Sequence, residues 1–240
     1  MKMCVSVGIG LFCATAGANT ITLKHNSGSG YGARDTARIT FNGNTQNVYA
    51  GVYALDRAGG TGLGTNWADG ARTVSAFCMD ILQHAPGSYA TYDVVALNQG
   101  PDPFGPMGTM RADALRELWG RYFDAAWMGS GPFTSSQNAA AEAFEICVWE
   151  IIFEDLPTSP AQWDVTRGKF SAGSIDYQRA NTWLHSLDGT GPKANLVCLS
   201  NGSYQDFPTV TTAPPPEPET LAFLASPLPL WVGLRRKRLA

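Results

Sequence analysis

Two short stretches of this 240-residue chain carry side chains that could react with one another. In the first, residues 77–80 (FCMD), the thiol of Cys78 comes at the end of a run that is typical of a β-strand. In the second, residues 144–152 (FEICVWEII), Glu145 lies within an apolar segment with helical spacing. A thiol can attack the carbonyl carbon of an acyl group, so Cys78 and Glu145 are the pair whose chemistry has to be weighed.

The position of Glu145 on its helix makes this carboxyl group unusual. At about 100° per residue, the apolar residues form one broad stripe, made up of Ala140, Ala141, Phe144, Val148, Ile151 and Ile152. Glu145 falls on the flank of that stripe, whereas Glu142, Glu150 and Glu154 are expected on the polar side. A carboxyl group beside the core needs a hydrogen-bond partner or a raised pKa.

Both stretches resemble motifs of the thioester-domain proteins of bacterial surfaces. Those families carry an aromatic-Cys strand motif, matched here by residues 77–78, and a helical motif ending in tryptophan, matched by Phe144, Val148 and Trp149. In those families the thiolate attacks a glutamine carboxamide, ammonia leaves, and the resulting internal thioester can acylate amines on a surface. The resemblance covers most of residues 35–210.

The chain departs from that family at the electrophile, because Glu145 occupies the glutamine position. An ionised carboxylate repels a thiolate and would have to expel oxide or hydroxide, so we expect no spontaneous thioester. Cys78, Glu145 and Trp149 are therefore predicted to form a degenerate thioester site, with the first two kept as hydrogen-bonded core residues. The alternative is a covalent surface adhesin that uses a thioester between Cys78 and residue 145.

Residues 1–18 have the pattern of a secretory signal peptide. Lys2 supplies the positive charge, and an apolar run follows it. Ala16 and Ala18 are the small residues expected at the −3 and −1 positions, so we predict cleavage after Ala18.

The C-terminal region combines a proline-rich linker, a short apolar segment and a basic end. Prolines stiffen residues 211–219, because each fixes its own φ angle. Residues 220–234 are apolar, but they are fewer than the roughly 20 residues that a spanning helix needs. The basic end contains Arg235, Arg236, Lys237 and Arg238, which the positive-inside rule keeps on the cytoplasmic side. Residues 220–240 therefore suit a temporary anchor better than a permanent one.

This arrangement resembles the PEP-CTERM sorting signal. The resemblance lies in the apolar segment, the basic end and the preceding residues Pro216, Glu217, Pro218 and Thr220. In that family an exosortase, a membrane-embedded cysteine transpeptidase, recognises the tail and removes it during export. The resemblance implies a Gram-negative, polysaccharide-producing host, an exosortase as partner and transient insertion into the inner membrane. It also implies a final location in the cell envelope or extracellular matrix, with polysaccharide or other surface components as candidate partners.

Removal of the signal peptide leaves three cysteines, Cys78, Cys147 and Cys198. Cys147 lies about 160° around the helix from Glu145, away from the face expected to meet Cys78. A disulfide between Cys147 and Cys198 is therefore favoured over one between Cys78 and Cys147, and no disulfide at all is the other possibility.

Composition and charge argue against several functional classes. The formal net charge is −3 and the basic cluster lies only at the C-terminal end, so no nucleic-acid partner is expected. The three histidines are isolated in the sequence, so we expect no metal and no cofactor. No nucleophile elbow appears and no carboxylate pair can be established, and we predict that the protein is not an enzyme.

Hydrophobic periodicity predicts a strand-rich first half followed by helices. Strands are expected at residues 37–41, 46–54, 73–81 and 92–97, a glycine-rich loop at 57–70, and closing strands at 196–199 and 204–210. Helices are expected at residues 111–126, 135–153 and 175–187. The predicted fold class is α+β: a strand-rich sandwich or barrel with an inserted helical subdomain, which the resemblance makes thioester-domain-like. We expect one extracellular domain over residues 19–210.

Overall fold

The computed structural model describes residues 18–26, 29–65, 73–101, 105–173 and 176–211. Its strands are β1 (Thr20–His25), β2 (Tyr31–Phe41), β3 (Asn44–Thr61), β4 (Thr73–Ala76), β5 (Ala90–Ala96), β6 (Phe170–Gly173), β7 (Leu196–Ser200) and β8 (Phe207–Val210). Its α-helices are α1 (Gly108–Tyr122), α2 (Ser135–Phe153) and α3 (Tyr177–His185). Residues 1–17 of the expected signal peptide, and residues 212–240 of the expected linker and sorting segment, lie outside the described residues.

The described strands form one antiparallel sheet in the order β6-β2-β3-β1-β5-β7-β8, with β4 paired to β3 beside this path. Strand β3 is long enough to pair with β2 along its first half, with β4 near its middle and with β1 along its second half. The turn between β2 and β3 is made by Asn42 and Gly43, whose φ angles are 47° and 80°. Asparagine and glycine tolerate these left-handed values better than other residues, so this pair sets the register of the hairpin.

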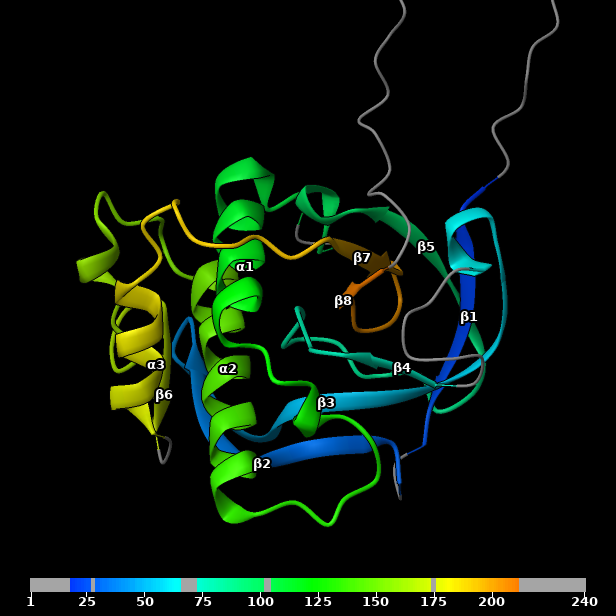
Figure 1. Ribbon diagram of the computed structural model, residues 1–240, viewed down its shortest axis with the longest axis horizontal. Helices are drawn as coiled ribbons and strands as arrows, with labels where there is room; N and C mark the ends of the chain where they lie inside the picture. Colours follow the sequence, from blue (N-terminus) through cyan, green and yellow to red (C-terminus); the bar gives the residue numbers. More distant parts are fainter. Residues whose placement is uncertain (1–17, 27–28, 66–72, 102–104, 174–175, 212–240) are drawn as a thin grey trace, which may run out of the picture.

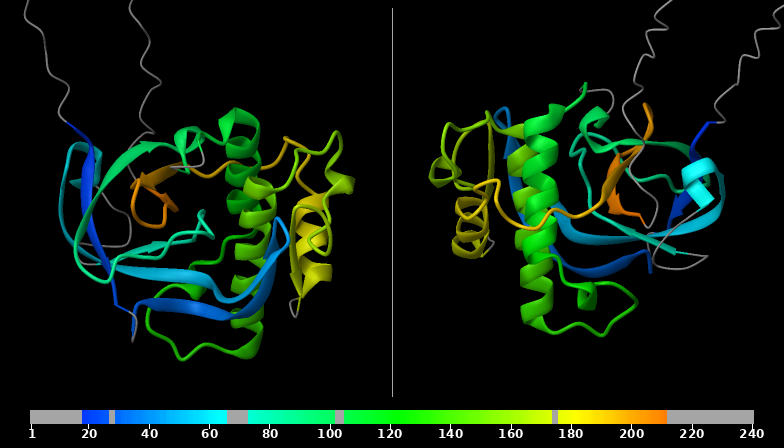
Figure 2. Two further views of the ribbon diagram at one scale, coloured as in Figure 1. Left: turned by 180° about the vertical axis from the view of Figure 1, so that it is seen from behind. Right: turned by 45° about the horizontal axis from the view of Figure 1, so that its top comes forward.

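The sheet closes on itself in the manner of a barrel. Beyond β4, the backbone N–H of Phe77 donates to Pro208 O (3.3 Å) and that of Met79 donates to Asp206 O (3.0 Å). The hydroxyl of Thr209 adds a hydrogen bond to Ser75 O (2.7 Å). These contacts bring β8 back beside β4, and the curled strands can be followed in both views of Figure 2.

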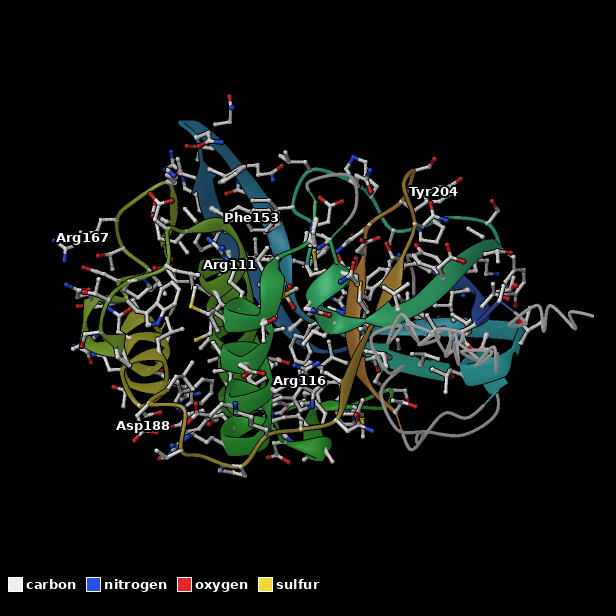
Figure 3. All side chains as sticks on the ribbon, turned by 90° about the horizontal axis from the view of Figure 1, so that it is seen from above. Arg111, Arg116, Phe153, Arg167, Asp188 and Tyr204 are labelled. Atoms are coloured by element: carbon white, nitrogen blue, oxygen red, sulfur yellow. The ribbon has the colours of Figure 1, made fainter. Side chains whose placement is uncertain are left out.

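The three helices gather on one side of the molecule together with β6, and the curled part of the sheet lies on the other side (Figure 1). Helix α2 is the central one, because it packs against β2, β3 and β6 as well as α1 and α3. Its first turn is fixed by a capping box between Thr134 and Gln137. At its other end, Arg111 of α1 donates to Ile151 O (3.0 Å) and Glu154 O (2.8 Å), close to Phe153 in Figure 3. A cation at a helix C-terminus also interacts favourably with the helix dipole.

Residues 141–152 of helix α2 are buried all the way round, which corrects one expectation from the sequence. Glu142 and Glu150, expected on a polar side, are both buried. The neighbouring elements cover the face that would otherwise meet solvent, so an apolar stripe alone does not locate the exposed side of this helix. Of the three glutamates expected on a polar side, only Glu154, which follows the last residue of the helix, is partly exposed.

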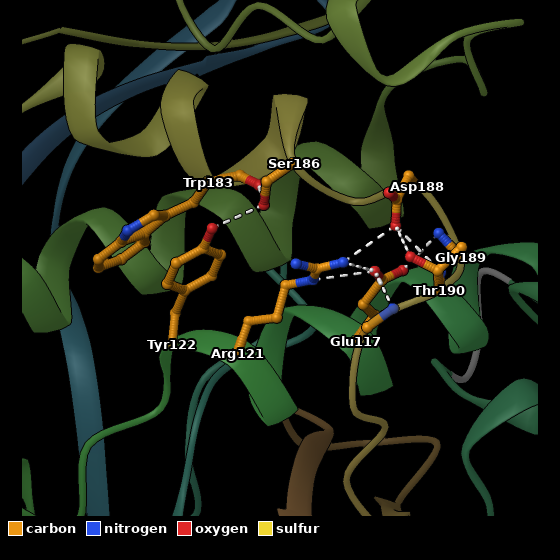
Figure 4. A network of polar contacts seen from close by, with 9 residues as sticks. Glu117, Arg121, Tyr122, Trp183, Ser186, Asp188, Gly189 and Thr190 are labelled. Atoms are coloured by element: carbon orange, nitrogen blue, oxygen red, sulfur yellow. Dashed lines mark hydrogen bonds and ion pairs between the residues drawn. The ribbon is translucent and has the colours of Figure 1, made fainter.

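An ion pair holds the loop after α3 against α1. The buried carboxylate of Glu117 accepts from both Nε (2.9 Å) and Nη2 (2.7 Å) of Arg121, and from the backbone N–H groups of Gly189 (2.8 Å) and Gly191 (2.9 Å). Arg121 also reaches Asp188 at 2.9 Å, as Figure 4 shows. The loop lies so close that a Cβ atom at Gly120 would come within 2.1 Å of Pro192 O.

The α+β class and the order of the predicted elements are confirmed, whereas several element boundaries differ from the expectation and two strands were not predicted. Strand β3 continues to Thr61, into residues that were expected to be a glycine-rich loop, because pairing with β1 supplies partners for its backbone. Strand β4 ends at Ala76 and not at residue 81, since the following residues bond to the β7–β8 region outside a regular ladder. Strands β1 and β6 were not predicted; each is short and depends on partners distant in the chain. Among the described residues, no helix has the length and apolar character needed to cross a membrane.

Candidate functional site

Cys78 and Glu145 are brought into contact by the approach of the segment after β4 to helix α2. The backbone N–H of Cys78 donates to Glu145 Oε2 at 3.2 Å. Both residues are buried, Cys78 with 2% and Glu145 with 0% of its surface exposed. The two stretches singled out in the sequence therefore meet in space, with the carboxyl group bound to the backbone of the cysteine.

The thiol of Cys78 is held by the backbone of Asp80, two residues further along the chain. Its Sγ donates to Asp80 O (3.2 Å) and accepts from the backbone N–H of Asp80 (3.4 Å). Burial raises the pKa of the thiol well above its ordinary value, and the nearby carboxyl group of Glu145 raises it further. The backbone at Asp80 and the indole of Trp149 oppose this rise in pKa without reversing it. At neutral pH the group is a thiol and not the thiolate that a nucleophile requires.

The carboxyl group of Glu145 is a neutral acid. Burial raises its pKa well above the ordinary value, and the single hydrogen bond from Cys78 N–H only partly opposes the rise. Its other oxygen, Oε1, has no hydrogen-bond partner among the described residues. An ionised carboxylate was expected at this position; burial instead favours the protonated carboxylic acid.

Trp149 lies one turn of α2 beyond Glu145 and borders the same site. Its ring is 2% exposed and packs edge-on to Phe170 of β6, with ring centroids 6.2 Å apart. The indole nitrogen makes no hydrogen bond of normal geometry, although it lies near enough to Cys78 to affect the pKa of the thiol. Trp149 therefore forms part of the wall around the thiol.

A pocket of about 270 Å³ opens over Cys78. Its walls come from β2, β3, the segment after β4, α2 and the β7–β8 loop. Besides Cys78 and Trp149, the lining includes Tyr31, Asn47, Tyr49, Tyr53, Asp80, Gln83 and Gln205. Cys78 is thus a floor residue of a small cleft that is lined by aromatic and amide side chains.

Asp80 is a buried carboxyl group in the wall of this pocket. Its Oδ1 accepts from the backbone N–H of Leu82 at 3.0 Å, whereas Oδ2 has no hydrogen-bond partner among the described residues. Burial raises its pKa from 3.8 to about 6, against the effect of the backbone N–H groups of Leu82 and Gln83. Asp80 is therefore mostly ionised at neutral pH and can accept hydrogen bonds from a ligand.

The predicted disulfide between Cys147 and Cys198 is wrong. No disulfide joins the three cysteines of the described residues. The thiol of Cys147 faces α3 and donates to Ala180 O at 3.5 Å, whereas Cys198 in β7 lies 3.4 Å from the sulfur of Met79. Helix α2 turns Cys147 toward α3 and away from the barrel, which separates the two thiols.

The processing residues expected from the sequence fall almost entirely outside the described residues. These are Ala16, Pro216, Glu217, Pro218, Thr220, Arg235, Arg236, Lys237 and Arg238. Ala18, the residue expected just before the cleavage point, is exposed and stands directly ahead of β1. Its carbonyl oxygen accepts a hydrogen bond from the hydroxyl of Thr61.

Sequence reasoning missed the tyrosines that share the pocket with Cys78. Tyr49 and Tyr53 are four residues apart on β3, so a strand places both on one face. That spacing could have grouped them with each other. Nothing in the sequence connects them with Cys78, because the contact depends on how the sheet curls.

The remaining chemistry of the described residues is limited. No group of three or more His, Cys, Asp or Glu side chains in the described ranges could hold a metal ion.

The chain matches no protein-family model, no curated protein and no solved structure. The resemblances read from its motifs are therefore proposals, which the geometry of the Cys78 site can support or weaken.

Proposed function

We propose that this chain is a non-enzymatic, exported protein of the cell envelope or extracellular matrix, cut at its C-terminus by an exosortase. Its body is a thioester-domain-like fold that has lost the crosslink and acts by binding. The tail sequence supports the sorting part of the proposal. The arrangement of Cys78 and Glu145 supports the binding part.

The observation that carries the non-covalent role is the buried hydrogen bond from Cys78 N–H to Glu145 Oε2, at 3.2 Å. A thiol attacks a carbonyl carbon as the thiolate, and burial opposes formation of that anion. The acid accepts a hydrogen bond from Cys78 N–H, as a core residue does. At neutral pH the sulfur of Cys78 is therefore held in its unreactive thiol form.

Intact mass of the native exported protein tests this binding role. We expect the mass of the mature chain with all atoms of Cys78 and Glu145 present, and no change after incubation with methylamine. A mass lower by one water, with a methylamine adduct forming at residue 145, would contradict the proposal.

One observation favours the covalent adhesin as a second candidate. Because Glu145 is a neutral acid, the repulsion between two negative charges no longer opposes attack by the sulfur. The reaction would form the S–C bond, break the C–OH bond of the acid and release one water. It would still require loss of the thiol proton, which burial disfavours.

The variant Glu145→Gln separates a lost electrophile from a lost geometry. If the site keeps thioester geometry, the amide releases ammonia and the mass of the variant falls by one ammonia, with methylamine adding to residue 145. If the variant has the mass calculated for an intact amide, the native site lacks the geometry for thioester formation as well as the glutamine. The double variant Cys78→Ala/Glu145→Gln is the control, because it has no thiol at this position.

Sorting is tested separately on envelope material from a host that has the exosortase and from the same host with the enzyme deleted. We expect the tail to be removed in the first strain and kept in the second. Finding the arginine-rich end still attached in both strains would overturn the sorting part of the proposal.

A further inference from the structure

Two buried oxygen atoms in the wall of the Cys78 pocket are unpaired. They are Oδ2 of Asp80 and Oε1 of Gln83, and neither has a hydrogen-bond partner among the described residues. The amide nitrogen of Gln83 donates to Gly202 O at 3.3 Å, which fixes the direction of its oxygen. Buried acceptors without donors are unfavourable, so a ligand that brings donors to these atoms would be stabilised.

Aromatic rings also line this pocket. The ring of Tyr31 lies 5.0 Å from that of Tyr53 and 5.6 Å from that of Tyr49, measured between centroids. Tyr49 is 52% exposed, so it stands at the mouth, whereas Tyr53 is buried. The guanidinium of Arg34 stacks on Tyr31 (4.0 Å) and Tyr49 (4.7 Å), which holds these two rings in place before any ligand arrives.

Fixed rings and unpaired acceptors in one pocket suit a ligand with an apolar face and hydroxyl groups around its edge. We propose that this pocket binds a single pyranose unit of a neutral polysaccharide, with its C–H face on the tyrosines and its hydroxyls on Asp80 and Gln83. The inference rests on the proposed function, since it assigns a ligand class to the body of the exported protein.

The pocket also distinguishes a sugar from a cation. An ammonium group needs only acceptors and ring faces, whereas Asn47 and Gln205 bring amide side chains that both donate and accept. Hydroxyl groups have the same dual character. The volume of about 270 Å³ lies near the lower end of ligand pockets, which suits one sugar unit and not a long segment of chain.

The experiment uses the full chain on an array of neutral and N-acetylated hexose oligosaccharides. The tightest-binding oligosaccharide is then titrated by calorimetry into the protein and three variants, each checked for folding by circular dichroism. Tyr49→Ala removes the ring at the mouth, and Gln83→Leu removes an unpaired acceptor. Tyr177→Ala is the matched control, because Tyr177 is similarly exposed at 48% and lies on α3 outside the pocket.

We expect Tyr49→Ala and Gln83→Leu each to weaken binding by about fivefold or more, and Tyr177→Ala to change it by less than about twofold. No binding to any glycan would overturn the inference, as would equal affinities for all variants. Binding of tetramethylammonium in the absence of glycan binding would overturn it in favour of a cation site. Because the assay does not depend on cutting the tail, its failure can be told apart from failure of the sorting proposal.

Discussion

Glu145 shows how burial changes the chemistry of a single side chain. Among the residues that the structure describes, its carboxyl group forms no ion pair and accepts one hydrogen bond, from Cys78 N–H. Burial keeps the group protonated. In that state it is close in shape and polarity to the amide of glutamine.

Substitution of Glu145 tests this protonated state. We expect Glu145→Gln to change the free energy of unfolding at pH 7 by less than about 1 kcal/mol, because an amide oxygen can accept the same hydrogen bond. Glu145→Ala should cost about 3 kcal/mol, because it leaves a cavity and an unpaired N–H at Cys78. Chemical denaturation measures both values. A large loss for the glutamine variant would show that the acid is ionised and paired.

The sequence predicts that Cys78 and Glu145 belong to one site, and the structure places them in hydrogen-bond contact. It could not predict that the acid is protonated, because the pKa depends on every element packed around α2. The unpaired oxygen of Asp80 is likewise a result of three-dimensional packing. Cys78, Glu145 and Trp149 can therefore be predicted from motifs, but neither their charge nor the tyrosines that share their pocket can.

Among the secondary-structure elements, α2 is unusual because it carries further acids that are buried. Burial raises the pKa of Glu142 and of Glu150 from 4.5 to about 8 each. Glu150 accepts one hydrogen bond, from Asp164 N–H at 3.3 Å, and its Oε2 has no partner among the described residues. Neither side chain forms an ion pair in the part of the chain that the structure describes.

The raised pKa values of Glu142 and Glu150 predict that the free energy of unfolding falls as pH rises. Between pH 4.5 and about 8 the folded state holds protons that the unfolded state has released, so each group lowers the free energy of unfolding. The loss is at most about 1.4 kcal/mol per pH unit for each group. Denaturation at pH 5 and pH 8 should show lower stability at pH 8, and Glu142→Gln should reduce the difference. Equal stability at both pH values would contradict the prediction.

The contact between α1 and the loop after α3 gives a second prediction at this scale. Glu117→Gln should lower the free energy of unfolding by about 2 kcal/mol, because an amide has one acceptor oxygen and cannot accept from the backbone N–H groups of both Gly189 and Gly191. Asp113→Asn is the control: its side chain is 43% exposed, and loss of its surface ion pairs should cost less than about 1 kcal/mol. Similar losses for the two variants would show that burial of Glu117 adds nothing.

The helices could be predicted well because their own sequences carry the signal. Apolar residues at helical spacing mark α1, α2 and α3, whereas the N-cap of α2 is Thr134 and not one of the two serines that follow it. The covered side of α2 could not be predicted, since β2, β3 and β6 reach it from distant parts of the chain. Short strands such as β6 could not be predicted for the same reason.

For the molecule as a whole, one aromatic cluster joins the strands to the helices. The ring of Phe144 lies 4.7 Å from Phe77, 5.4 Å from Trp119 and 5.5 Å from Trp127, measured between centroids. Phe77 follows β4, whereas the other rings belong to the helical region. The curled sheet and the helices therefore share one core.

Phe144→Ala should lower the free energy of unfolding by about 4 kcal/mol. The exposed Met110→Ala, at 72% exposure, should change it by less than about 0.5 kcal/mol. Because the core is shared, calorimetry of both proteins should show one cooperative transition. Two separate transitions would mean that the helical region and the sheet unfold independently.

Closure of the sheet also determines when the chain can fold. Strand β1 pairs with β5, and the other edge of β5 pairs with β7, which comes about 100 residues later in the chain. The backbone N–H groups of residues 77 and 79 find their partners in Pro208 and Asp206, at the start of β8 and just before it. A chain delivered N-terminus first, from a ribosome or through a translocation channel, exposes its early strands long before residues 196–210 arrive to seal them. Such a polypeptide stays open while it is being threaded, and becomes compact only once the whole body has emerged.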